Sequence, residues 1–329
     1  MNQNVADGVL KVLEARMLNP ITRMIRLGRE DGAALPAWTP GSHIKVQVTL
    51  PDGNTDWRHY SLIALDGTGN ATPHDYTIAV RREAQSRGGS AFMHDVLQEG
   101  SLLPYQHPSN NFPLEAAPGK TVFVAGGIGI TPLISMMHAC AAGQRPMHLY
   151  YAGRSRSLMA FLDTLEQRLG ANITVHADDE QGGAFLDVDG LLGSVAAVDR
   201  VYLCGPKPML DGALASAKAR QWEAGRLHFE LFTVAEPEAG DHAFEVELAQ
   251  SGVTLTVPAN QSILDCLIEH GYDPLYDCKR GECGVCTLPV LEGEIDHRDY
   301  VLTDSEKASG KMMQVCVSRA KGNKLVLDF

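Results

Sequence analysis

The chain has no apolar stretch long enough to cross a bilayer, which takes about 20 predominantly apolar residues. Its first 17 residues contain neither a basic segment nor an apolar core, so no secretory signal is predicted. Basic residues are also scarce, because 28 Lys and Arg stand against 40 Asp and Glu, giving a net charge of −12. This deficit argues against a nucleic-acid partner. An acidic surface could steer a basic partner protein or simply keep the chain soluble.

Cysteines are few but grouped. Cys278, Cys283 and Cys286 follow the spacing C-x4-C-x2-C, and Cys316 comes later. This spacing is typical of a plant-type [2Fe–2S] cluster, whose fourth ligand arrives from a distant segment. Gly281 and Gly284 would let the loop bend tightly and bring N–H groups toward the sulfurs. Structural zinc is the main alternative, but its sites favour two close pairs of ligands. A disulfide fits the bunched spacing less well.

The other three cysteines, Cys140, Cys204 and Cys266, are an odd number, which suits a reducing compartment, and we expect a cytoplasmic protein. The chain has 329 residues, 44% of them hydrophobic, which is enough for two or three domains with separate cores. Cys140 and Cys266 fall in predicted helices and are expected to be ordinary core residues.

The first third of the chain predicts a small antiparallel barrel. Short β-rich runs at 22–27, 44–50 and 60–64 alternate with Pro-Gly and Pro-Asp-Gly turns. In a strand, Arg58 and Tyr60 of the run Arg58-His59-Tyr60-Ser61 share one face, so one could hold a phosphate while the other lies along a planar ring. The alternative is an ordinary strand with exposed polar residues.

A second phosphate-suited element follows at Arg87-Gly88-Gly89-Ser90, which precedes a predicted helix at 91–98. A glycine-rich turn before a helix offers free N–H groups to an anion. The simpler reading is a glycine loop with a capping serine. Both elements in one barrel favour a phosphorylated cofactor.

The middle third predicts a nucleotide-binding α/β domain. A strand at 121–125 runs into Gly126-Gly127-Ile128-Gly129-Ile130-Thr131-Pro132 and a helix at 133–142, with Thr131 as its expected cap. The turn lacks the G-x-G-x-x-G fingerprint, yet its small residues, Gly127 and Gly129 among them, would let a pyrophosphate approach. Further strands are expected at 148–151, 173–177 and 201–204, and further helices at 158–169 and 208–221.

Two strand ends in this domain could contact the nucleotide, because open α/β sheets bind ligands at the carboxyl ends of their strands. Arg154 and Arg156 follow one strand and could reach ribose or phosphate, or remain solvated loop charges. Cys204 ends another strand and could place its thiol at the same crevice, or it could be an ordinary small core residue.

The last third begins with a polar segment, 234–242, read as a linker. Strands at 244–248, 254–257 and 325–329 and a helix at 262–270 predict a β-grasp sheet that presents the cysteine loop on a surface.

These motifs together resemble the phthalate dioxygenase reductase family, which includes vanillate demethylase and carnitine monooxygenase reductases. The resemblance covers essentially the whole chain. It rests on the stretches named above, on Phe229-Glu230-Leu231-Phe232, and on the tail motifs around His297 and Cys316. It implies a multidomain fold: an FMN-binding antiparallel β-barrel (1–113), an NAD-binding α/β domain with a parallel sheet (114–233), a linker (234–242) and a plant-type [2Fe–2S] ferredoxin domain of β-grasp fold (243–329).

The resemblance also assigns roles to residues. Those implied to hold the FMN phosphate are Arg58, Gly88, Gly89 and Ser90. Those implied to line the flavin are Tyr60, Ser61, Ala79, Val80 and Arg81, with His59 in the same strand. Phe232 would cover the flavin ring where the nicotinamide enters. Those implied to contact the nicotinamide nucleotide are Thr131, Arg154, Cys204 and Met209. Phe232, Cys204 and Ser61 would surround the reacting atoms.

The implied function is an NADH-dependent reductase component of a two-component Rieske-type oxygenase. NADH would deliver a hydride to FMN, and the cluster, with Cys278, Cys283, Cys286 and Cys316 as ligands, would pass single electrons to the oxygenase. Expected partners are NADH and the oxygenase in a transient complex, with no nucleic acid, no membrane and a monomeric chain. Arg154 and Arg156 leave a preference for NADPH open. Two alternatives are another acceptor, such as a ferredoxin or a haem protein, and a cluster-based redox sensor without turnover.

Overall fold

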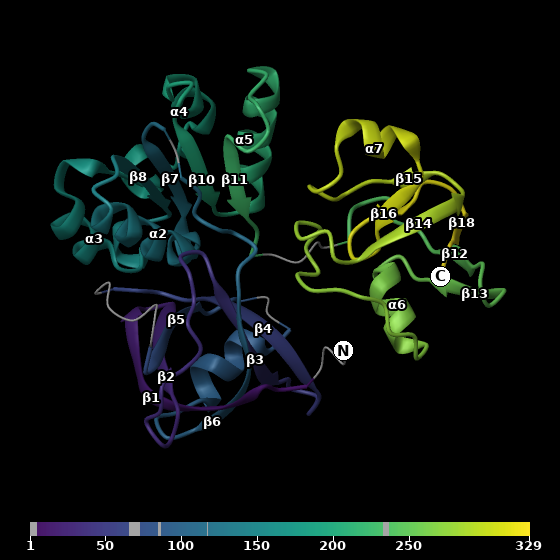
Figure 1. The fold of residues 1–329 in the computed structure, drawn as a ribbon, viewed down its shortest axis with the longest axis horizontal. Coiled ribbons are helices and arrows are strands. Elements are labelled where there is room, and N and C mark those ends of the chain that lie inside the picture. Colours follow the sequence, from purple (N-terminus) through teal and green to yellow (C-terminus); the bar gives the residue numbers. More distant parts are fainter. Residues whose placement is uncertain (1–4, 66–72, 85–86, 117, 233–236) are drawn as a thin grey trace. The chain divides into compact units, whose positions relative to one another are not determined.

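The computed structural model describes residues 5–65, 73–84, 87–116, 118–232 and 237–329 (Figure 1). The chain divides into two compact units, Met1–Glu230 and Leu231–Phe329. Residues 234–236 of the predicted linker lie outside the described residues. Within the described part of the chain, no helix is both long enough and apolar enough to span a membrane.

The first unit begins with a six-stranded antiparallel sheet, which confirms the predicted barrel. Its strands are β1 (Gly8–Asn19), β2 (Thr22–Gly28), β3 (His43–Thr49), β4 (Thr55–Ser61), β5 (Asp75–Arg81) and β6 (Leu102–Ser109), in the order β4-β3-β6-β1-β2-β5. The sheet curls so that its two edges meet, because the Ile63 N–H just after β4 donates to the Thr77 carbonyl of β5 at 2.9 Å. Ile44, Val46 and Val48 alternate along β3 and are fully buried inside.

The helical stretch of the barrel starts two residues before its predicted position. It consists of α1 (Gly89–Ala91) and a π-helical turn (Phe92–Val96). Gly88 precedes it with φ 106°, a left-handed conformation that glycine adopts without strain. The Arg23 guanidinium occupies the other end and donates to the carbonyls of Met93, His94 and Leu97 at 2.7–2.9 Å. The conformation of Gly88 therefore sets where the helical stretch begins, and the hydrogen bonds from Arg23 set where it ends.

The rest of this unit is built on a parallel sheet, as predicted. Its strands are β7 (Thr121–Gly126), β8 (Met147–Gly153), β9 (Ile173–Ala177), β10 (Arg200–Cys204) and β11 (Leu227–Glu230), in the order β11-β10-β7-β8-β9. Its helices are α2 (Ile130–Ala142), α3 (Leu162–Leu169), α4 (Val188–Ser194) and α5 (Lys207–Ala219), of which α5 lies alongside β11 (Figure 1). The chain proceeds from β7 outward to β9 and then returns to the other side of β7. The carboxyl ends of β7 and β10 are therefore a topological switch point, where such sheets bind ligands.

The buried serine Ser135 joins the barrel to α2 through two hydrogen bonds. The Ser135 hydroxyl donates to the Leu62 carbonyl at 2.7 Å and accepts the Ala64 N–H at 3.0 Å. Both backbone groups belong to the barrel, just after β4. Ser135 is 1% exposed, so water cannot replace its hydroxyl as the hydrogen-bond partner of these two backbone groups.

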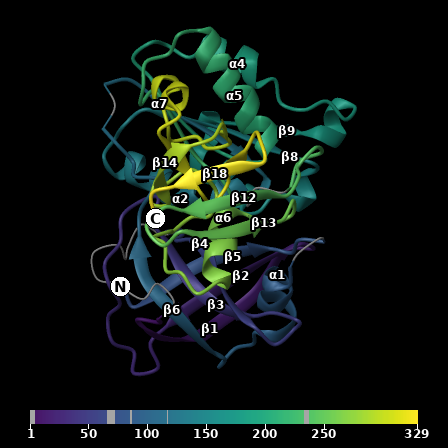
Figure 2. The ribbon, with the colours of Figure 1, turned by 90° about the vertical axis from the view of Figure 1, so that its right-hand side faces the viewer.

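The second unit has the predicted β-grasp fold. Its main sheet contains β12 (Phe244–Leu248), β13 (Val253–Val257), β14 (Thr287–Glu292), β16 (Met312–Gln314) and β18 (Lys324–Leu327), in the order β13-β12-β18-β14-β16. Figure 2 shows α6 (Ile263–Glu269) beside β13. The Ser262 hydroxyl caps this helix by accepting the Asp265 N–H at 3.0 Å. The short pair β15 (Ile295–Asp296) and β17 (Arg319–Ala320) and helix α7 (Asp304–Ser309), none of them predicted, complete the unit.

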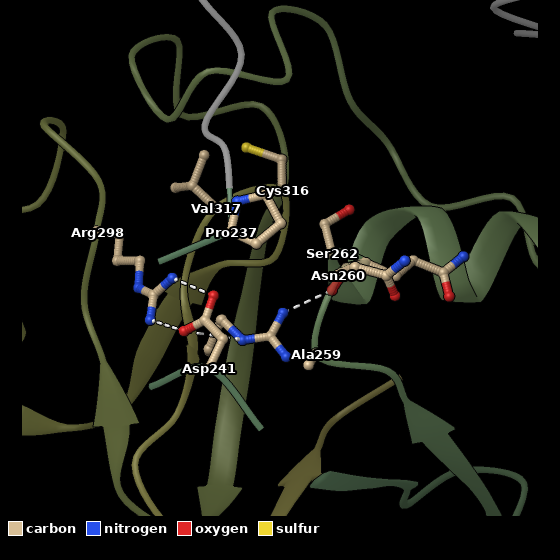
Figure 3. A pocket seen from close by; sticks show the side chains of 10 residues that line it. Pro237, Asp241, Ala259, Asn260, Ser262, Arg298, Cys316 and Val317 are labelled. Carbon is tan, nitrogen blue, oxygen red and sulfur yellow. Dashed lines mark hydrogen bonds and ion pairs between the residues drawn. The ribbon is translucent and has the colours of Figure 1, made fainter. Parts of the chain in front are cut away.

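Asp241, placed by sequence in the polar linker, has a side chain that is only 7% exposed and ion-paired (Figure 3). Its carboxylate accepts two hydrogen bonds from the Arg298 guanidinium, at 2.5 and 3.1 Å, which lowers its pKa to about 2. The Arg319 Nε lies 3.8 Å away, and this guanidinium also donates to the carbonyls of His242, Pro258 and Gln261. Asp241, Arg298, Arg319 and Cys316 are among the residues that line a cavity of about 50 Å³. The end of the predicted linker is thus fastened to the second unit.

Replacing Ser135 by alanine is expected to destabilise the first unit by about 1–3 kcal/mol, because the Leu62 carbonyl and the Ala64 N–H would both lose a buried partner. Trp38, Trp57 and Trp222 all lie in this unit, so tryptophan fluorescence during urea unfolding reports on it. Ser157→Ala, at an exposed position, is the matched control. Equal unfolding midpoints for the two variants would refute this role of Ser135.

Candidate functional site

The four cysteines of the predicted cluster site form two contacting pairs. Cys283 lies within hydrogen-bonding distance of Cys278, and its thiol helps to lower the pKa of Cys278 to about 5. Cys286 and Cys316 form the second pair, in which contact with Cys286 raises the pKa of Cys316. A tetrahedral zinc site would gather all four sulfurs around one ion, whereas thiols grouped in two contacting pairs suit a two-iron cluster. No disulfide links any of the seven cysteines.

The loop that carries three of these cysteines has the backbone predicted for it. Gly281 and Gly284 have φ values of 74° and 76°, in the left-handed region that favours glycine. The Arg280 N–H donates to the Cys278 sulfur at 3.3 Å, and the Gly281 N–H partly offsets the rise in the Cys316 pKa that Cys286 and burial cause. Amide donors directed at the sulfurs stabilise thiolates, the form that binds iron. The donor set and its surroundings therefore fit a [2Fe–2S] cluster.

One polar neighbour of this site escaped the sequence analysis. Gln314 is fully buried. Its Oε1 accepts a hydrogen bond from the Cys286 thiol at 3.4 Å, and its Nε2 donates one to the Thr287 hydroxyl at 2.7 Å. No sequence signal distinguishes it from other glutamines. Its position depends on the pairing of β14 with β16, in which Thr287 faces Gln314.

The two phosphate-suited elements of the barrel lie side by side. A Cβ atom added to Gly89 would stand 2.6 Å from the Arg58 Nε, and one added to Gly88 would stand 2.3 Å from the Pro51 Cδ. The start of α1 therefore leaves no room for side chains and is flanked by a guanidinium. Arg58 is held by the Asp56 carboxylate and the Trp57 carbonyl. Ser90, at the same turn, accepts the Glu83 N–H at 3.1 Å.

The residues implied to line the flavin lie on the two strands whose edges meet. Tyr60, half-buried, and Ser61, buried, end β4, while buried Ala79 and Val80 lie on β5. His59 stacks on His43 with ring centroids 4.8 Å apart and an interplanar angle of 12°. Arg81, also on β5, has an Nη1 atom 3.9 Å from where a Cβ of Gly127 would stand. The barrel strands thus reach the glycine turn of the α/β sheet.

The glycine turn at the end of β7 is shaped by close packing. A Cβ on Gly129 would lie 2.1 Å from the Cys204 carbonyl oxygen, and one on Gly126 would lie 2.5 Å from the Pro206 Cδ. The turn and the end of β10 are thus in direct backbone contact at the switch point. The cap expected at Thr131 is wrong, because α2 already begins at Ile130 and the Thr131 hydroxyl donates to the Ile128 carbonyl at 3.0 Å. A nucleotide-binding role for Gly127, Gly129 and Thr131 stays a prediction.

The other residues implied to contact nucleotide sit at the same end of the sheet. Cys204 is fully buried at the end of β10, and the Met209 sulfur would lie 2.8 Å from a Cβ of Gly205. Arg154 is exposed, whereas Arg156 is partly exposed and paired with the Glu166 carboxylate. Phe232, half-buried, directly follows Leu231, and its place over the flavin ring stays a prediction.

Glu230 is a further candidate that the sequence analysis did not assign. It ends β11, is 5% exposed and is the register partner of Cys204 in the parallel sheet. A carboxylate is therefore buried beside the thiol predicted near the nicotinamide. The motif Phe229–Phe232 contained this residue, but only the pairing of β10 with β11 brings it to the switch point.

Comparisons with known proteins agree with this geometry. Residues 246–321 match the family model described as "2Fe-2S iron-sulfur cluster binding domain", and residues 123–214 match "Oxidoreductase NAD-binding domain". The carnitine monooxygenase reductase subunit of Acinetobacter pittii is 39% identical over 312 residues, with 95% of this chain and 99% of that protein covered.

Two solved structures are similar over nearly the whole chain. A solved structure of phthalate dioxygenase reductase, a modular structure for electron transfer from pyridine nucleotides to [2Fe–2S], matches with a TM-score of 0.74 and 34% identity, and the match covers 98% of each chain. An intact type IV self-sufficient cytochrome P450 monooxygenase matches with a TM-score of 0.74 and 37% identity, covering 98% of this chain. This chain spans only 41% of that monooxygenase.

Replacing Cys316 by serine is expected to abolish or severely deplete the cluster, because one contacting pair would lose its second thiolate. The measurements are visible absorbance and iron and sulfide content per chain after anaerobic reconstitution. Cys266→Ala, which removes a buried thiol from α6 in the same unit, should keep a full complement. Unchanged cluster absorbance in the Cys316 variant would show that Cys316 is not a ligand.

Proposed function

Because the chain belongs to the phthalate dioxygenase reductase family, we propose that it is the NADH-dependent reductase component of a two-component Rieske-type oxygenase system. The observation that carries the proposal is the presence, on one chain, of a phosphate-suited turn beside Arg58, a glycine turn at a topological switch point and two contacting thiol pairs. When bound, FMN accepts a hydride and releases electrons singly, and the [2Fe–2S] cluster carries one electron at a time.

In the barrel, the chain binds and orients the flavin. Arg58 supplies positive charge to the phosphate, and the backbone at Gly88, Gly89 and Ser90 supplies N–H donors. Tyr60, Ser61, Ala79, Val80 and Arg81 line the ring system. By the family resemblance, Phe232 would cover the flavin ring and keep water from it.

At the switch point, the chain positions the nucleotide. The turn containing Gly127, Gly129 and Thr131 receives the pyrophosphate, while Arg154 and Met209 contact the rest of the nucleotide. Cys204 and Ser61 would line the space where the nicotinamide meets the flavin. The buried Glu230 carboxylate, in register with Cys204, helps to fix the nicotinamide. Because hydride transfer needs no proton donor at these positions, orientation is the main contribution of the chain.

In the second unit, Cys278, Cys283, Cys286 and Cys316 hold the cluster, and the exposed Val285 side chain marks where the loop reaches solvent. We propose that a Rieske-type oxygenase docks there in a transient complex, with the reductase as a monomer in the cytoplasm. Support comes from relatives whose names describe reductase subunits, such as the one paired with carnitine monooxygenase.

A haem protein is the second candidate acceptor. The similarity to the reductase portion of a self-sufficient cytochrome P450 monooxygenase favours it, since nearly the whole of this chain matches part of a haem enzyme. Purified chain with NADH should separate the two candidates: reduction of a Rieske oxygenase supports the first, whereas reduction of a cytochrome P450 alone supports the second. Absence of NADH oxidation, even with ferricyanide as acceptor, would contradict both and leave the sensor hypothesis.

Replacing Arg58 by alanine is expected to weaken FMN binding by roughly 10- to 100-fold, because the phosphate would lose a charge-assisted partner. Riboflavin, which lacks the phosphate, should bind the variant as well as it binds the unaltered chain. Fluorescence titration of both flavins measures the difference, with Arg82→Ala, which removes an arginine paired to Asp95, as the control. An equal loss for FMN and riboflavin would place the phosphate elsewhere.

A further inference from the structure

A buried ion pair lies within the cluster loop, between two of the cysteines. The Arg280 Nε stands 2.8 Å from the Glu282 Oε1, and the two side chains are 8% and 9% exposed. Neither residue is a thiolate ligand. Burying a carboxylate is costly unless charges and hydrogen bonds compensate, so its remaining oxygen needs a partner.

That partner is the backbone of Leu231. The Leu231 N–H donates to the Glu282 Oε2 at 2.7 Å, across 51 positions of sequence. Leu231 itself is 3% exposed. A charge-assisted hydrogen bond of this length, shielded from water, is among the stronger single contacts available to a loop.

Leu231 occupies a distinctive place in the chain. It follows the last residue of β11, Glu230, and is the first residue of the unit that contains the cysteines. It also immediately precedes Phe232, the proposed cover of the flavin ring. Glu282 therefore fastens the cluster loop to the first residue of its own unit, next to Phe232.

We propose that Glu282 is a positioning residue for electron transfer: by holding the Leu231 amide, it fixes the cluster loop relative to Phe232. Arg280 orients the carboxylate for this contact. The inference rests on the proposed function, because it concerns the passage of one electron from reduced flavin to the oxidised cluster, which is thereby reduced. The proposed role depends on the length of the Glu282 side chain rather than on its charge.

Two conservative variants separate reach from charge. Glu282→Gln keeps an oxygen at the same distance from Leu231 but removes the charge, whereas Glu282→Asp keeps the charge and shortens the side chain. We expect the glutamine variant to reduce its cluster at a rate within about twofold of the unaltered chain. The aspartate variant should be slower by roughly tenfold or more, since small misplacements are costly in positioned transfer. Rates come from anaerobic rapid mixing with NADH, per cluster. Glu292→Gln and Glu292→Asp, on the exposed part of β14, are the matched controls.

Hydrogen–deuterium exchange at the Leu231 amide gives a readout independent of activity. Exchange should accelerate by roughly tenfold or more in the aspartate variant and stay slow in the glutamine variant. A variant that fails to hold the cluster is compared with chelator-treated, cluster-free unaltered protein, so that loss of metal is not mistaken for loss of the contact.

The opposite pattern, with a fast aspartate variant and a slow glutamine variant, would assign Glu282 an electrostatic role and overturn the proposal. Wild-type behaviour of both variants would overturn it as well. Failure of the unaltered chain to oxidise NADH would instead refute the proposed function, while Leu231 exchange would still test the contact.

Discussion

The structure depends most on one constraint: four thiols must be held as two contacting pairs without closing into disulfides. A loop of nine residues, Cys278 to Cys286, does most of this work, with two glycines in left-handed conformation and amides directed at sulfur. The fourth thiol, Cys316, comes from the segment after β16, so the second pair exists only when the β-grasp sheet is formed. Cluster binding and folding of this unit are therefore coupled.

In the first unit, glycines likewise lie where a side chain or another backbone segment packs closely against the chain. Gly89 makes room for Arg58, and Gly129 makes room for the Cys204 carbonyl. Each contact brings a candidate cofactor residue to its place, so packing and binding geometry have the same origin. The nearby Ser135 bridge then joins the barrel to α2, the helix that follows the glycine turn.

Sequence reasoning succeeded where the chemistry is local in the chain. Cysteine spacing, the glycine-rich turns and the alternation of strands and helices all lie within short windows, and they led to the fold class and to the family. Sequence reasoning missed the residues that only the pairing of strands far apart in the chain brings to the candidate sites. Gln314 reaches Cys286 only through the register of β14 with β16, and Glu230 reaches Cys204 only through β10 and β11. Asp241 resembled a linker residue because its partners, Arg298 and Arg319, lie far along the chain.

The central claim is that electrons enter this chain in pairs and leave it singly, through two cofactors with different capacities. Anaerobic reductive titration of the reconstituted protein tests this most directly, by counting electrons taken up per chain while absorbance follows flavin and cluster. The account predicts an uptake of about three electrons, two by the flavin and one by the cluster. An uptake of two or fewer by protein loaded with both cofactors would contradict it.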